Sequence, residues 1–238
     1  MPTLRLEEYA FRIMENQLRM QEWLESHQFN WGLDLTAGRL TFKDAATGAP
    51  IADLPMQLIG SQSDETNTWL WSWANENGGD GLPSSVTRLA ASVRDFAAAS
   101  GADSRFTNAD TFPLPDANFG YEMSTVCAGF GGAFGYYRCP YDGGAAWVVI
   151  EAFPEAAAFP ASPLLPTKAI TGAISTFTLD HRAATQAYLG TPDASGVYAN
   201  GMTVTFDAQG RIGNMQMTLN PAPKPASPLD AVKRFFGG

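Results

Sequence analysis

Apolar side chains alternate with polar ones through four short segments between residues 29 and 75. Two segments form the stretch FNWGLDLTAGRLTFKD, in which Ala-Gly supplies the turn, and residues 51–62 and 66–75 form the other two. A period of two is typical of half-buried strands, and links this short join antiparallel neighbours. The region therefore predicts an antiparallel meander of four strands.

The last of these strands carries three tryptophans at every second position: Trp69, Trp71 and Trp73. Since successive side chains of a strand point to opposite faces, the three indoles share one face. The opposite face is small and mixed, so the indole face is the one that should meet the helices. We expect a mostly buried row of indoles, with room for one of them to reach a cleft.

Helical periodicity marks three segments that would cover such a sheet, namely residues 4–27, 84–99 and 116–132, because apolar residues recur at i, i+3 and i+4 in each. Two more strands are expected over residues 135–140 and 145–153, across the turn YDGG. Together these elements predict an α+β fold in which an antiparallel sheet is covered by helices.

The first predicted helix is apolar on two sides. Opposite its broad apolar face lies a second stripe of Leu4, Phe11 and Leu18, placed there by the rotation of about 100° per residue. A helix of this kind is either sandwiched inside the fold or half reserved for another chain. We keep both interpretations: burial on both sides, or a stripe that binds a protein partner or a second copy.

The rest of the chain is expected to form smaller parts beyond a main domain of residues 1–153. Residues 154–168 hold four prolines and predict a linker or a surface strap, because proline blocks both ladder and helix hydrogen bonds. Residues 169–220 predict a small β-α-β-β unit. Residues 221–238 form a proline-rich tail that ends in a short helix.

The tail helix has an apolar edge made of four residues: Leu229, Val232, Phe235 and Phe236. Two turns of helix are not stable alone in water. Such a segment orders only when it docks, either on its own chain or in the groove of a partner.

Charge and hydropathy exclude several classes of function. The formal net charge is −9, with only four lysines, whereas a nucleic-acid binder needs a basic stripe. No apolar run approaches the 18 residues of a membrane span, and the acidic, polar N-terminal residues do not resemble a secretory signal. We expect a cytoplasmic protein that binds no nucleic acid.

Residues suited to catalysis or metal binding are scarce. Two histidines and two cysteines do not supply the three or four closely spaced ligands of a zinc site. Cys127 and Cys139 are expected to be free thiols, and no phosphate or dinucleotide motif occurs. We therefore expect no metal ion and no cofactor.

Two carboxylates precede the tryptophan strand and offer one alternative. Asp64 and Glu65 beside exposed indoles would resemble a carbohydrate cleft, in which rings stack on sugars while carboxylates bond hydroxyls. The simpler interpretation is a solvated turn. The residues of this alternative ligand site are Asp64, Glu65, Trp69, Trp71, Trp73 and Asn75.

The pattern G-S-x-S followed by T-W-L-W-x-W-A-N, residues 60–75, resembles an uncharacterised bacterial family, a domain of unknown function. The aromatic hairpin ahead of it and the later G-x-Y-R-x-P element within GYYRCPYDGG are similar to that family as well. The resemblance covers roughly residues 1–153. It implies a bacterial, intracellular, single-domain core, and it brings no activity or catalytic residues.

These features favour a non-enzymatic protein-binding factor, of an accessory, chaperone-like or toxin-neutralising kind. An acidic chain that is poor in motifs, with a two-sided first helix and a docking tail, suits such a role. The alternative is an enzyme or sensor for a small neutral ligand in the acidic cleft, and a third interpretation is a structural component that self-associates through the stripe of the first helix.

Overall fold

The structure is a computed structural model that describes residues 3–75, 81–159 and 162–218. Its described part falls into two compact units, which divide between Tyr188 and Leu189. The tail stripe predicted at residues 229–236 lies outside the described residues.

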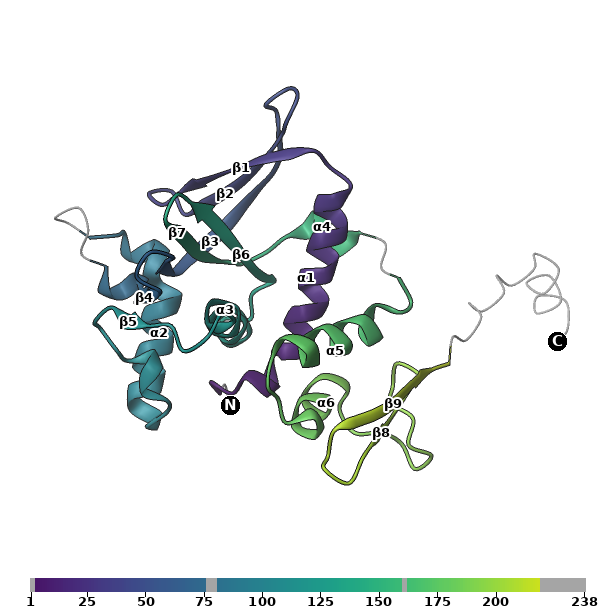
Figure 1. Cartoon of the computed structure of the whole chain (residues 1–238). Coiled ribbons are helices and arrows are strands. Elements are labelled where there is room, and N and C mark those ends of the chain that lie inside the picture. The colour runs from purple at the N-terminus through teal and green to yellow at the C-terminus, as the bar shows by residue number, and fades with distance from the viewer. Residues whose placement is uncertain (1–2, 76–80, 160–161, 219–238) are drawn as a thin grey trace, which may run out of the picture. The chain divides into compact units, whose positions relative to one another are not determined.

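The first unit is built around one antiparallel sheet (Figure 1). Strand order runs β1-β2-β3-β4-β5, and the hairpin β6–β7 joins through pairing of β7 with β3. The bounds are β1 Phe29–Asp34, β2 Arg39–Asp44, β3 Pro50–Ser63, β4 Thr68–Trp71, β5 Phe112–Pro113, β6 Gly135–Tyr141 and β7 Gly144–Ile150. The predicted meander and the predicted hairpin over residues 135–153 are both confirmed.

Six α-helices accompany the sheet in the described part of the first unit. Their bounds are α1 Ala10–Glu25, α2 Ser84–Ser100, α3 Phe119–Phe130, α4 Pro154–Ala158, α5 Leu165–Thr176 and α6 His181–Leu189. Short 3-10 turns add η1 Leu6–Glu8, η2 Ser72–Ala74 and η3 Ser104–Phe106. The α+β class and the three helices predicted before residue 133 are therefore confirmed.

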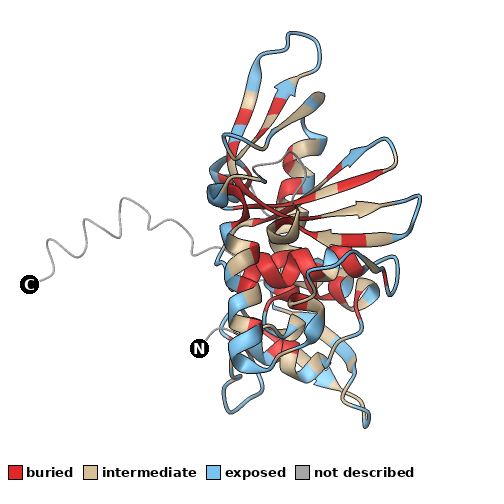
Figure 2. Cartoon of the chain, turned by 90° about the vertical axis from the view of Figure 1, so that its left-hand side faces the viewer, coloured by how far each residue is buried: buried red, intermediate tan, exposed pale blue. Residues whose placement is uncertain are grey.

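Buried residues form two clusters, because successive side chains of the central strands point to opposite faces of the sheet. On β3, Ile59 belongs to the cluster under α2 and α3, and Leu58 belongs to the cluster enclosed by β1, β2 and α4. On β7, Val149 and Val148 divide in the same way. Figure 2 shows the buried positions concentrated where the helices meet the sheet, whereas the hairpin ends are exposed.

The region after residue 153 differs from the sequence prediction. The expected linker contains α4 and the start of α5, with Pro154 and Pro166 in their first turns, where a missing N–H costs nothing. The strand expected at the start of residues 169–220 is wrong, because that segment continues α5. Its buried residues Ala169, Ile170 and Ala173 follow helical spacing and pack α5 against α1.

The second unit contains a hairpin of β8 Met202–Phe206 and β9 Ile212–Met217. The turn DAQG closes it, since Gly210 donates to the carbonyl of Asp207 at 3.0 Å. The last two strands of the predicted β-α-β-β unit are thus present. The helix predicted in that unit is α6. It begins at His181, and the carboxylate of Asp180 just before it accepts from the N–H groups of Arg182 and Ala183 at 3.0 Å each.

Candidate functional site

The tryptophan row is largely a core feature. Trp69 and Trp71 are fully buried, with ring centroids 5.4 Å apart in an edge-on arrangement. Trp71 donates from Nε1 to the carbonyl of Arg105 at 2.8 Å. The prediction of burial is confirmed for these two indoles, which offer no surface to a ligand.

Trp73 departs from the predicted row, because the strand ends at Trp71 and Ser72–Ala74 forms a 3-10 turn. Its indole is half-buried beneath the guanidinium of Arg94, 4.9 Å from the ring centroid. Asn75 is half-buried beyond that turn, and its N–H donates to the carbonyl of Ser72.

The two carboxylates of the alternative ligand site lie on the turn between β3 and β4 and are exposed. Asp64 accepts from Gln62 at 2.9 Å and lies 3.7 Å from the guanidinium of Arg138. The structure thus brings Asp64 to the end of β6 and not to an exposed indole. None of the six residues proposed for the carbohydrate-type cleft lines the hollows described below.

The second stripe of α1 is mainly covered within the first unit. Phe11 is buried and meets the ring of Tyr188 edge-on at 6.0 Å. Leu4 and Leu18 are half-buried. Of the two interpretations of this helix, burial on both sides describes Phe11, which leaves it unavailable to another chain.

Neither cysteine is placed for nucleophilic chemistry. Cys127 and Cys139 are both free and buried. Burial raises the pKa of the Cys139 thiol to about 12 and raises that of Cys127 as well, because a thiolate is costly in an apolar interior. Across residues 3–75, 81–159 and 162–218, no three histidine, cysteine or carboxylate side chains come together to hold a metal ion.

The largest hollow described here is a cleft of about 610 Å³ between α1 and β6, a size typical of ligand pockets. We call it the aromatic cleft. Its residues are Gln17, Met20, Gln21, Leu24, Glu25, His27, Phe29, Tyr121, Tyr136, Tyr137, Arg138 and Pro140. Tyr121 on its rim is one of three large hydrophobic side chains that are exposed in the described structure, and Tyr141 at the end of β6 is another.

One wall of the aromatic cleft is a free edge of the sheet, since β6 pairs with β7 alone among the described strands. The pair Tyr141–Gly144 flanks the two-residue turn, and the pair Tyr137–Val148 lies an even number of residues further along the ladder. In an antiparallel pair, hydrogen-bonded and non-hydrogen-bonded positions alternate. The backbone groups of Tyr136, Arg138 and Pro140 therefore point away from β7, toward α1.

Helix α1 covers the beginning of this edge. Gln17 donates from Nε2 to the carbonyl of Tyr136 at 3.1 Å and accepts from its N–H at 3.0 Å. Asn16 donates from Nδ2 to the carbonyl of Phe134 at 2.6 Å. A side chain at Gly135 would displace the Gln17 amide, so glycine there permits the close approach.

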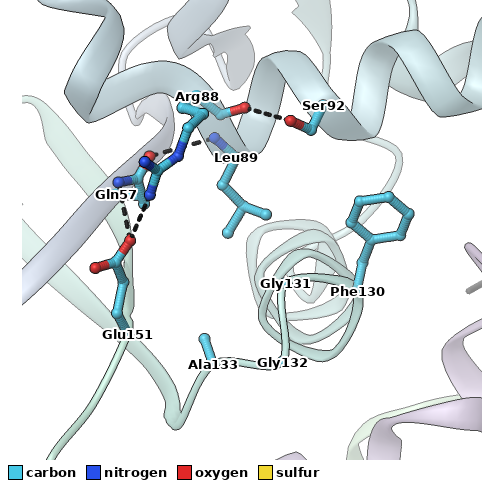
Figure 3. A pocket seen from close by; sticks show the side chains of 9 residues that line it. All are labelled: Gln57, Arg88, Leu89, Ser92, Phe130, Gly131, Gly132, Ala133 and Glu151. Atoms are coloured by element: carbon cyan, nitrogen blue, oxygen red, sulfur yellow. Dashed lines mark hydrogen bonds and ion pairs between the residues drawn. The ribbon is translucent and has the colours of Figure 1, made fainter.

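A second hollow of about 310 Å³ lies between α2 and the end of α3 (Figure 3). The buried Gln57 donates to Glu151 at 3.0 Å, and Arg88 donates to the same oxygen, Oε1, at 3.1 Å. Figure 3 shows the side chains of Leu89 and Phe130 forming its apolar wall. An adjoining hollow of about 410 Å³ shares Glu151 and continues toward α1.

With this geometry in view, comparison with known proteins assigns a family. A model of a family of unknown function, DUF6882, matches residues 5–153. The chain belongs to the DUF6882 family. The resemblance expected over residues 1–153 is thus confirmed, and the DUF6882 segment contains the whole sheet of the first unit.

The DUF6882 match assigns no activity, and no curated protein or solved structure matches the chain. In the part of the chain that the structure describes, no helix combines the length and the apolar character that a membrane crossing requires.

Sequence reasoning missed the aromatic cleft, because its walls come from residues 17–29 and 121–140 of the DUF6882 segment. The signal that pointed toward it was the G-x-Y-R-x-P element, which lies on β6 and supplies four cleft residues: Tyr136, Tyr137, Arg138 and Pro140. Gln17 carried no such signal, since a polar residue between apolar positions of a helix ordinarily faces water.

Proposed function

We propose that this protein is a non-enzymatic protein-binding factor, of an accessory, chaperone-like or toxin-neutralising kind, and that the aromatic cleft is its docking surface. The observation that carries the proposal is the combination of an exposed aromatic rim with a free strand edge in one cleft. Tyrosine is enriched where proteins bind proteins, because it buries a large area while keeping a polar tip.

The charge of the protein supports the same role. A net charge of −9 on 238 residues attracts basic partners over several ångströms at physiological salt and raises the rate of encounter. The aromatic rings of the cleft would then supply the short-range contacts after the encounter.

Site-specific photocrosslinking tests this proposal. A benzoylphenylalanine in place of Tyr121 keeps an aromatic ring at the rim, and the same substitution at Leu164 on the loop before α5 provides a control that is also exposed. Irradiation in the native host should give a discrete higher-mass protein adduct from position 121 and none from position 164. Equal adducts from both positions, or none from position 121, would reject the aromatic cleft as the docking surface.

A small-molecule role is the second candidate, and the hollow of Figure 3 favours it more than the tryptophan strand does. Gln57 and Arg88 both donate to Oε1 of Glu151, and the apolar side chains of Leu89 and Phe130 line the same hollow. Titration with a panel of sugars and small metabolites, followed by calorimetry, tests this reading. Binding that is lost in Glu151→Gln but kept in Glu155→Gln would move the function from partner binding to ligand handling.

A further inference from the structure

The open part of the β6 edge has one backbone position that offers both a donor and an acceptor. Tyr136 is already bonded in both directions by Gln17, and Pro140 has no N–H to offer. Between them, the outward N–H and C=O of Arg138 have no hydrogen-bond partner among the described residues. An edge that presents one free donor and acceptor pair can accept one residue of an extended chain.

The side chains around Arg138 differ on the two faces of the sheet. Tyr136 and Tyr121 lie on the face of Trp147, with ring centroids 6.4 and 4.7 Å from that indole. Tyr137 lies on the other face, where its ring meets Phe42 at 5.3 Å. Since side chains of an added strand alternate between faces, consecutive residues of a bound segment would meet aromatic rings on both.

Besides its tyrosines, the ionisable residues of the cleft are Glu25, His27 and Arg138. The guanidinium of Arg138 has Asp64 at 3.7 Å and stands over the ring of Trp147 at 6.0 Å. Glu25 accepts from Gln21 at 2.7 Å and has no ion pair within the described part of the chain. The carboxylate without a cation is therefore on the α1 side of the cleft, which favours a lysine or arginine in the ligand.

We propose that the aromatic cleft binds an extended segment of a partner protein by strand addition. One residue of that segment exchanges backbone hydrogen bonds with Arg138, a basic side chain pairs with Glu25, and flanking apolar side chains pack on the tyrosines. This inference rests on the proposed function and adds to it the conformation and the chemistry of the bound segment.

The probe is a synthetic peptide, acetyl-Thr-Leu-Lys-Leu-Thr-amide, titrated into the full-length protein and followed through the backbone amide signal of Arg138 by NMR. A matched peptide with glutamate in place of lysine should bind at least about tenfold more weakly, the change expected for loss of one charge-assisted contact. Glu25→Gln should remove this preference. Glu22→Gln provides the control, since Glu22 pairs with Lys168 and does not line the cleft.

The backbone pairing is tested separately by methylating each peptide nitrogen in turn. One methylated position, the residue opposite Arg138, should lose about tenfold in affinity, and its neighbours should not. On the protein side, Arg138→Pro removes the outward N–H and leaves the ladder with β7 intact, whereas Arg138→Ala keeps that N–H. The lysine peptide should bind Arg138→Ala more tightly than Arg138→Pro, because both lack the guanidinium and only Arg138→Ala keeps the outward N–H; equal binding to the two variants would overturn the backbone pairing.

The outcomes separate this inference from the proposed function. A crosslink at position 121 together with equal binding of all methylated peptides would overturn strand addition and leave the docking surface in place. A crosslink with no binding of the lysine peptide would overturn the basic, apolar chemistry. Absence of both would overturn the docking surface itself.

Discussion

Gln17 of α1 holds the backbone of Tyr136 on β6 through two hydrogen bonds, as a neighbouring strand would. The pair joins residues that are 119 positions apart and closes one end of the sheet edge. It therefore performs two tasks, fixing α1 against the sheet and protecting β6 from unwanted pairing.

Gln17→Ala should lower the free energy of unfolding by about 1–3 kcal/mol, because two part-buried backbone groups lose their partner. The uncovered edge should also increase self-association. Urea denaturation and size-exclusion chromatography measure the two effects. Gln21→Ala, one turn further along α1, removes a side chain that donates to the exposed Glu25 and should change neither; equal effects in both variants would show that the edge contact is unimportant.

Gly120 on α3 and Gly172 on α5 make a matched pair of helical glycines. A Cβ at position 120 would overlap the indole ring of Trp147, whereas one at position 172 would meet Met14 at an ordinary 3.4 Å. Gly120→Ala should destabilise the protein by about 1–3 kcal/mol through overpacking. Gly172→Ala should stabilise it by up to about 1 kcal/mol through helix propensity.

Thermal and urea unfolding of the two variants measure this difference. Stabilisation by both alanines would mean that α3 moves away from β7 at little cost.

Phe11 distinguishes the two interpretations of the first helix. Because its ring is buried against Tyr188, Phe11→Glu should cost about 3 kcal/mol or more in stability, from lost packing and a buried charge. Leu18→Glu at a half-buried position of the same stripe should cost much less. Circular dichroism in urea gives both values, and a stable Phe11→Glu protein that has changed its oligomeric state would instead support a partner surface.

The buried thiols predict a loss of stability in alkali. The pKa of Cys139 is raised from an ordinary 9.0 to about 12 by burial. The native state therefore keeps its proton where the unfolded chain releases it, so the contribution is complete below pH 9 and disappears as the pH rises toward 12.

Urea unfolding at pH 7, 9 and 10.5 measures this decline, which Cys139→Ala should make shallower. An unchanged slope in that variant would assign the alkaline loss to other groups, such as Tyr136, whose pKa burial also raises.

The strands and early helices were predictable because their local patterns agree with their environment. Residues 29–44 alternate and form a hairpin, and Gly101 ends α2 in the left-handed conformation, as a terminating glycine should. The burial of Trp69 and Trp71 followed from the same alternation. The early end of β4 did not, since nothing local distinguishes Ser72 from a strand residue.

The helix α5 was missed because its composition favours a strand. Ile170, Thr171 and Ile174 are β-branched, and their intrinsic preference points away from a helix. Packing of Ala169 and Ala173 against α1 stabilises the helix over the strand. The hydroxyl of Thr171 also donates a hydrogen bond to the carbonyl of Thr167, one turn earlier, at 2.9 Å. The helical spacing of Ala169, Ile170 and Ala173 is present in the sequence, but the β-branched residues among and beside them give the stronger local signal.

Strand β3 contributes to both buried clusters, since its neighbouring residues Leu58 and Ile59 each belong to a different one. It also pairs with β2 over its first half and with β7 and β4 over its second. A slip of one residue along it would exchange the occupants of both layers at once. The two layers should accordingly melt together, in a single transition, and helices α1 and α2, which contribute buried side chains to both, favour the same outcome.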